Sequence, residues 1–172
     1  MNIATISDED ISELEDMMSN SSEFLRPIPT AEAEKFGHNK LRLFMHKYGL
    51  YTFPTTELIE YLAGLIQGKS AIEIGAGMGV IGRSLGIPIT DNKMQEWPEV
   101  KACYDACMQP TIKYPSDIIE MAAVEAVRHY KPDIVLGSYI THKWRPGMRI
   151  GTNVKFRINV VTRSYHILFG IS

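Results

Sequence analysis

Three glycines at alternate positions, Gly75, Gly77 and Gly79, form the most informative pattern in this chain of 172 residues. They follow a short apolar segment and precede Val80, so the pattern predicts a buried strand, a glycine loop and the start of a helix. Glycines at such a turn let a ligand approach the backbone more closely than a Cβ atom would allow. The alternative is a turn that needs glycine only for packing.

A carboxylate accompanies this loop. Glu73 lies inside the predicted strand, two residues before Gly75. Burying a carboxylate costs free energy unless a hydrogen-bond donor satisfies it. We therefore expect a polar ligand near the end of this strand.

Two known patterns fit these residues. Gly77, Gly79 and Gly82 match G-x-G-x-x-G, the fingerprint of NAD(P)-binding folds, in which a pyrophosphate lies at a helix N-terminus. The segment Glu-Ile-Gly-Ala-Gly-Met-Gly, residues 73–79, also resembles the acidic-x-Gly-x-Gly-x-Gly signature of class I S-adenosylmethionine-dependent methyltransferases. We prefer the second interpretation because it accounts for Glu73, which the dinucleotide pattern leaves unexplained.

The resemblance extends over about residues 48–144, with residues 131–144 as a second similar segment, and is nearest to small methyltransferase-like proteins of bacteria and their phages. It implies an S-adenosylmethionine cofactor whose methionine part lies against the glycine loop. The residues that it assigns to the cofactor in this region are Glu73, Gly75, Ala76, Gly77 and Gly79.

The resemblance also implies a role for an acid at the end of the second strand, which binds ribose hydroxyls in this family. Asp91 is the residue at that place. Its position beside Asn92 is explained equally well by a turn. Asp117 lies where some relatives contact the adenine, but as the first residue of a predicted helix it is better explained as an N-cap.

The fourth strand should bring its carboxyl end to the mouth of the site, where open parallel sheets bind ligands. Ser138, Tyr139 and His142 lie at that end. We assign Ser138 to the cofactor, and Tyr139 and His142 to catalysis. An ordinary histidine pKa of about 6.5 suits a general base at neutral pH, although a lone histidine is more commonly a surface residue. The methyl acceptor stays undefined, and residues 137–140 replace the Asp/Asn-Pro-Pro-Tyr/Phe motif of many nucleic-acid methyltransferases.

Hydrophobic periodicity predicts the elements that position these residues. Residues 1–47 should form an N-terminal helical extension, and residues 48–172 a Rossmann-like domain of class α/β, an open parallel sheet with flanking helices. We expect helices at 8–18, 31–47, 54–67, 80–85, 94–109 and 117–130, and strands at 70–74, 87–91, 111–114 and 134–140.

The C-terminal part, residues 145–172, is atypical for the family because no helix signal separates two candidate strands at 154–161 and 165–171. The domain is therefore expected to be abbreviated at its C-terminus. This leaves a third interpretation, a truncated non-catalytic binding module of the same fold. An incomplete sheet favours self-association through the tail.

The composition bears on which partners the protein could bind and on where in the cell it is expected. The net charge of -2 does not indicate a nucleic-acid partner. No apolar run approaches the roughly 18 residues of a membrane span, and no signal-peptide pattern begins the chain. We expect a cytoplasmic protein, in the host cytoplasm if it is virally encoded. Cys103 and Cys107 are expected to be half-buried thiols, and no histidine spacing suggests a metal site.

Overall fold

The computed structural model describes residues 9–21, 23–138 and 166–169 of the chain. The elements follow one another along the sequence as α1 (Ser12–Met18), α2 (Thr30–Glu34), α3 (Gly37–Lys47), α4 (Thr56–Ile66), β1 (Ala71–Ile74), α5 (Val80–Leu85), β2 (Ile89–Asp91), the 3-10 helix η2 (Met94–Glu96), α6 (Pro98–Ala106), β3 (Ile119–Glu120), α7 (Ala123–Tyr130), β4 (Ile134–Gly137) and β5 (His166–Phe169).

The strands form one sheet in the order β3-β2-β1-β4-β5, and every neighbouring pair is parallel. This confirms the α/β class and the open parallel sheet of Rossmann-like type. The chain leaves β1 toward β2 and β3 on one side, and then returns past β1 to β4 on the other side. Ligands of open parallel sheets bind beyond the strand ends at such a reversal.

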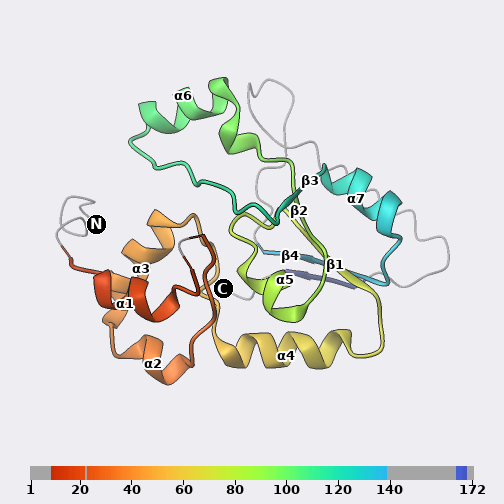
Figure 1. Cartoon of the computed structure of the whole chain (residues 1–172), viewed down its shortest axis with the longest axis horizontal. Helices are drawn as coiled ribbons and strands as arrows, with labels where there is room; N and C mark the ends of the chain where they lie inside the picture. The colour runs from red at the N-terminus through yellow and green to blue at the C-terminus, as the bar shows by residue number, and fades with distance from the viewer. Residues whose placement is uncertain (1–8, 22, 139–165, 170–172) are drawn as a thin grey trace.

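Helices cover both faces of the sheet (Figure 1). Successive side chains of a strand point to opposite faces. Ile72 and Ile74 of β1 are buried against Ala126 of α7, whereas Ala71 belongs to a cluster that includes Leu62 of α4. Glu73 shares the face of Ala71, and its side chain therefore points toward the layer that contains α4 and α5. Within the described residues, no helix is long and apolar enough to cross a membrane.

The N-terminal helices pack directly against the glycine segment. Leu14 and Met18 of α1 and Phe44 of α3 have no exposed surface, and they share one apolar cluster with Met78 and Val80. Figure 1 shows α1, α2 and α3 together at one side of the sheet, next to the loop that follows β1. Met78 of the loop and Val80 at the start of α5 are consequently covered by residues from the first part of the chain.

The elements nearest to the glycine loop agree with the sequence predictions. Thr55 is the N-cap of α4, and its hydroxyl accepts a hydrogen bond of 3.2 Å from the Leu58 N–H. Gly86, in the left-handed conformation, ends α5. Two N-terminal helices differ from their predictions: α1 begins only at Ser12, and the helix expected at 31–47 is divided into α2 and α3. The division lies before Gly37, whose φ is 73°.

The third strand was placed wrongly from the sequence. Residues 111–114 are extended but unpaired with the sheet, because Ile112 and Tyr114 pack toward the N-terminal helices and the Ile112 N–H donates to Gln95 Oε1 at 3.0 Å. Residues 119–120, expected in a helix, form β3 beside β2. The helix expected at 117–130 is therefore shortened to α7. The helix expected at 94–109 consists of η2 followed by α6.

The C-terminal prediction is confirmed in part. The strand expected at 165–171 exists as β5, which pairs in parallel with β4 from Ile134↔His166 to Gly137↔Phe169. Within the described residues the sheet therefore extends past its fourth strand. The strand expected at 154–161 lies outside the described residues.

Two glycines in helices give a matched test of the packing around β1. A Cβ atom at Gly82 of α5 would overlap Ile89 of β2 and lie 2.6 Å from Glu73 Oε2, whereas one at Gly64 of α4 would meet nothing within 4 Å. We expect Gly82→Ala to destabilise the protein by about 1–3 kcal/mol or more through overpacking. Gly64→Ala should stabilise it by up to about 1 kcal/mol, because alanine is the better helix former. Urea unfolding measures both changes, and equal effects of the same sign would contradict the packing described.

Candidate functional site

Asp91 connects the end of β2 to the glycine loop that follows β1. Its Oδ2 accepts a hydrogen bond of 2.9 Å from the Gly77 N–H, and its Oδ1 accepts one of 2.8 Å from the Lys93 N–H. The side chain is 7% exposed. Asp91 and Gly77, which the sequence assigned to a cofactor site from two separate segments, are therefore in direct contact. Asp91 acts both as a turn residue, through Lys93, and as a support for the loop.

Glu73 lies beneath the first turn of α5. It is 2% exposed, and its Oε2 accepts a hydrogen bond of 2.8 Å from the Gly82 N–H. This N–H has no partner within the helix, because the first helical hydrogen bond runs from the Arg83 N–H to the Gly79 carbonyl. Burial raises the pKa of Glu73 to about 7, against the lowering effects of the Gly82 N–H and the Arg83 charge. The sequence led us to expect a polar ligand for this carboxyl group, whereas its hydrogen-bond donor is a backbone N–H of the protein itself.

The glycines of the loop fall into two kinds. Gly75, Gly77 and Gly79 all have positive φ, of 59°, 54° and 66°. A Cβ at Gly79 would lie 2.6 Å from Ile118 and 2.9 Å from Ile89, so packing alone accounts for this glycine. A Cβ at Gly77 would meet only Ile112, at an ordinary 3.7 Å. Space therefore remains beside the backbone at Gly77, unlike at Gly79.

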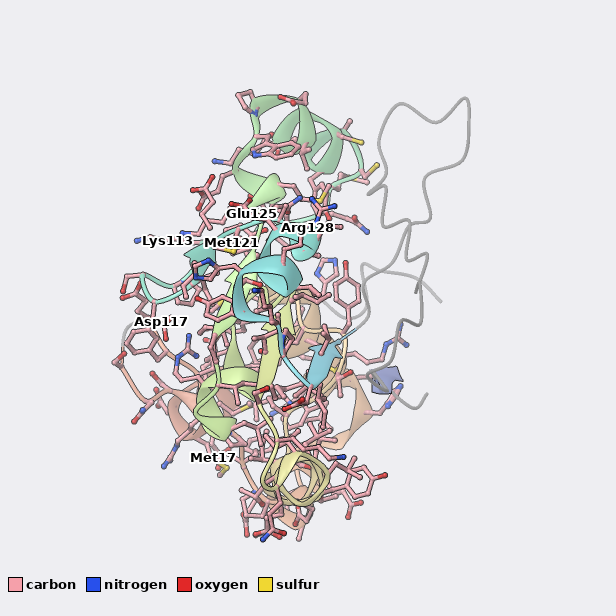
Figure 2. All side chains as sticks on the ribbon, turned by 90° about the vertical axis from the view of Figure 1, so that its right-hand side faces the viewer. Met17, Lys113, Asp117, Met121, Glu125 and Arg128 are labelled. Atoms are coloured by element: carbon pink, nitrogen blue, oxygen red, sulfur yellow. The ribbon has the colours of Figure 1, made fainter. Side chains whose placement is uncertain are left out.

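Arg83 ties this region to two other segments. Its Nε and Nη2 donate to the two carboxylate oxygens of Asp117 at 2.7 Å each, and its Nη1 donates to the Met78 carbonyl at 3.2 Å. The guanidinium also lies 4.6 Å from the centre of the Phe24 ring. Asp117 is therefore an ion-pair partner on the flank of the molecule (Figure 2), and not the helix cap that the sequence suggested.

Two further residues assigned to the cofactor from the sequence, Ala76 and Ser138, contact neighbouring segments. The Ala76 N–H donates to the Thr90 carbonyl at 3.0 Å, which fixes the loop against β2. The Ser138 hydroxyl, at the end of β4, lies 3.2 Å from the Thr52 hydroxyl in the segment before α4. Tyr139 and His142 lie outside the described residues, so their catalytic assignment stays a prediction.

A cleft of about 570 Å³ begins at the glycine loop. Met78 of the loop, Ile112 and Tyr114 line one side of it, and residues of α1 together with the end of α3 line the other. This volume lies within the usual range of small-molecule sites. Tyr114 connects the cleft to Asp91, because it lines the cleft and its side chain hydrogen-bonds Asp91. Burial raises the pKa of Tyr114, and the Asp91 charge raises it further. The cleft therefore adjoins both the loop and the acid that supports it.

The opposite wall of the cleft was not predicted from the sequence. Glu15 of α1 accepts a hydrogen bond of 2.9 Å from the Tyr48 hydroxyl and forms an ion pair of 2.5 Å with Lys47. Burial, and then the hydrogen bond and charge of Glu15, raise the pKa of Tyr48 to about 12. These residues are more than thirty positions apart in the sequence, and no local pattern signals that α1 and the end of α3 meet beside the loop.

Comparisons with known proteins gave no assignment: no protein-family model, curated protein or solved structure matched this chain.

The buried carboxyl group of Glu73 should make stability depend on pH in an unusual direction. Its pKa rises from 4.5 to about 7 on folding, so the folded protein binds the proton more tightly than the unfolded chain does. The free energy of unfolding contributed by Glu73 should therefore fall by about 3 kcal/mol as pH rises from 4.5 to 7, and level off above 7. In Glu73→Gln this contribution is absent.

Urea unfolding of the parent and of Glu73→Gln at several pH values measures this effect. The parent should lose stability relative to the variant between pH 4.5 and 7. Glu60→Gln, at an exposed position of α4, serves as the control and should follow the parent at every pH. A constant difference between the parent and Glu73→Gln across this range would contradict the account.

Proposed function

We infer that this chain binds S-adenosylmethionine at the carboxyl end of the sheet and is a methyltransferase with an unidentified acceptor. The observation that carries this proposal is the hydrogen bond between Asp91 and the Gly77 N–H. A class I methyltransferase site needs an acid of the second strand next to the glycine loop, because the two contact adjoining parts of one cofactor. Asp91 and Gly77 have this relation.

Asp91 keeps the capacity to bind a ligand as well as the loop. A carboxylate offers about four lone-pair positions on its two oxygens. The described contacts occupy one position on each oxygen, through Gly77 and Lys93, and the Tyr114 hydroxyl hydrogen-bonds the same carboxylate. The remaining position suits a hydroxyl group, which a ribose provides. The open space beside Gly77 suits the part of the cofactor that approaches the backbone.

The rival NAD(P) interpretation is weakened by Glu73. In dinucleotide folds the pyrophosphate lies at the N-terminus of the helix after the loop. Here a buried carboxyl group lies beneath the first turn of that helix and accepts from Gly82. This carboxyl group takes the Gly82 N–H, which a pyrophosphate at this helix N-terminus would otherwise accept from. The sulfonium cofactor has no phosphate and avoids this conflict. Gly82 packs closely on Ile89, so a glycine is needed at this position whether the cofactor is S-adenosylmethionine or NAD(P).

The chemistry of methyl transfer makes few demands on catalytic side chains. The methyl group leaves a sulfonium sulfur by in-line displacement, and the donor carries its own leaving group. The protein mainly orients the acceptor and excludes water. The cleft beside Met78 offers a volume for the acceptor, next to the proposed cofactor position. If the acceptor must lose a proton, His142 is the general base that the sequence suggests.

Two glycines with the same backbone conformation make a matched test. Gly77 and Gly86 have φ of 54° and 66°, and a Cβ at Gly86 would meet nothing within 4 Å. Alanine at either position should cost about 1–2 kcal/mol of backbone strain. Only Gly77→Ala places a methyl group in the proposed ligand space. We expect calorimetry with S-adenosylhomocysteine to show at least a tenfold loss of affinity for Gly77→Ala and less than a twofold change for Gly86→Ala.

The same calorimetry includes NAD as the competing ligand. The proposal expects binding of S-adenosylhomocysteine and none of NAD by the parent. Failure of the parent to bind S-adenosylhomocysteine, a preference for NAD, or equal losses in the two alanine variants would each contradict it. Urea unfolding of both variants checks that their stabilities fall by similar amounts.

A further inference from the structure

Helix α6 and its C-cap residue carry two thiols that the proposed methyltransferase site does not use. Cys103 and Cys107 are both exposed, whereas half-buried thiols were expected from the sequence. Val100 is the buried residue of this helix, and α6 packs chiefly on the preceding η2. Both views place α6 at one end of the molecule (Figures 1 and 2). The two thiols are therefore accessible to solutes.

The thiols share one face of α6. The Cys107 N–H donates to the Cys103 carbonyl at 3.2 Å, so the two residues are one helical turn apart. Side chains at this spacing lie on the same face, with Cβ atoms about 5–6 Å apart. A disulfide needs Cβ atoms about 3.5–4.5 Å apart. The helix therefore opposes an intramolecular disulfide and keeps the pair available as a dithiol.

This spacing suits two sulfur ligands on one metal ion. Metal–thiolate bonds are about 2.3 Å long for zinc, so sulfurs on opposite sides of a shared ion stand roughly 4–5 Å apart. Side chains with Cβ atoms about 5–6 Å apart can reach that separation by rotation about χ1. Two thiols one helical turn apart can therefore coordinate the same soft metal ion without a change in the helix backbone.

The number of ligands selects the kind of ion. Zinc in proteins normally takes four ligands. Within the part of the chain that the structure describes, no group of three or more His, Cys, Asp or Glu side chains is arranged to hold a metal. Monovalent copper is stable with two thiolates alone, and soft sulfur ligands favour it. The pair therefore fits Cu(I) better than zinc.

We propose that Cys103 of α6 and Cys107, the C-cap residue of this helix, form a two-coordinate binding site for Cu(I). One ion forms two copper–sulfur bonds while each thiol releases its proton, so Cu⁺ and two thiols give a dithiolate complex of charge −1 and two protons. No electron is transferred. The site is separate from the glycine loop, and its occupation does not depend on the methyltransferase proposal.

The test uses the reduced full-length protein without oxygen, with Cu(I) supplied as its complex with the coloured chelator bicinchoninate. The parent should remove one Cu(I) per chain from the chelator. Cys103→Ser and Cys107→Ser should each weaken binding by roughly 10²-fold, because each removes the advantage of a second ligand on the same chain.

A positional control keeps two thiols but separates them. The double variant Asp105→Cys, Cys107→Ser has thiols at 103 and 105, and residues two apart in a helix do not face each other. Asp105 is exposed, so the change leaves the core intact. This variant should bind as weakly as the single serine variants, with the helical circular dichroism of the parent.

Three results would overturn the copper site. The first is a parent protein that removes no Cu(I) from the chelator, and the second is binding that survives either serine substitution or the positional control. The third is a copper-bridged pair of chains in native mass spectrometry, because it would show that the two thiols of one helix do not share an ion.

Discussion

Two buried carboxyl groups on neighbouring strands are satisfied by backbone N–H groups of the segment that follows β1, and the site depends on this arrangement. Asp91 of β2 accepts from Gly77, and Glu73 of β1 accepts from Gly82. Each carboxyl group would be costly to bury without its donor. The loop and the first turn of α5 are thus held at two points, one by each strand. A loop fixed in this way loses little freedom when a ligand binds.

The same segment also contacts the N-terminal helices and the segment before β3. Met78 and Val80 pack among the N-terminal helices, while Arg83 joins the loop carbonyl of Met78 to Asp117. The start of α5 is therefore packed against the beginning of the chain. Helix α6, which follows β2, is left at the end of the molecule, and this explains why its cysteines are exposed.

The sequence predicts this structure well where local signals agree. The apolar segment before Gly75, the alternate glycines and the stop at Gly86 specify β1, the loop and α5, and the structure contains all three. The region from 111 to 122 fails because long-range contacts decide it. Ile112 is drawn to the N-terminal cluster, and the Met121 N–H donates to the Asp91 carbonyl. Hydrophobic periodicity also does not predict the hydrogen bond between Glu73 and the Gly82 N–H. Nor does it predict the hydrogen bond between Tyr48 and Glu15 beside the loop.

The central claim is that the loop supported by Asp91 is the binding surface for an adenosyl cofactor. Amide NMR of the ¹⁵N-labelled protein during titration with S-adenosylhomocysteine tests this at the atoms concerned. The account predicts that the amide signals of Gly75 and Gly77 are among those that shift most, while the Gly86 signal stays in place. Saturating ligand that leaves both loop signals unmoved, or that shifts only signals remote from residues 75–79 and 91, would contradict it.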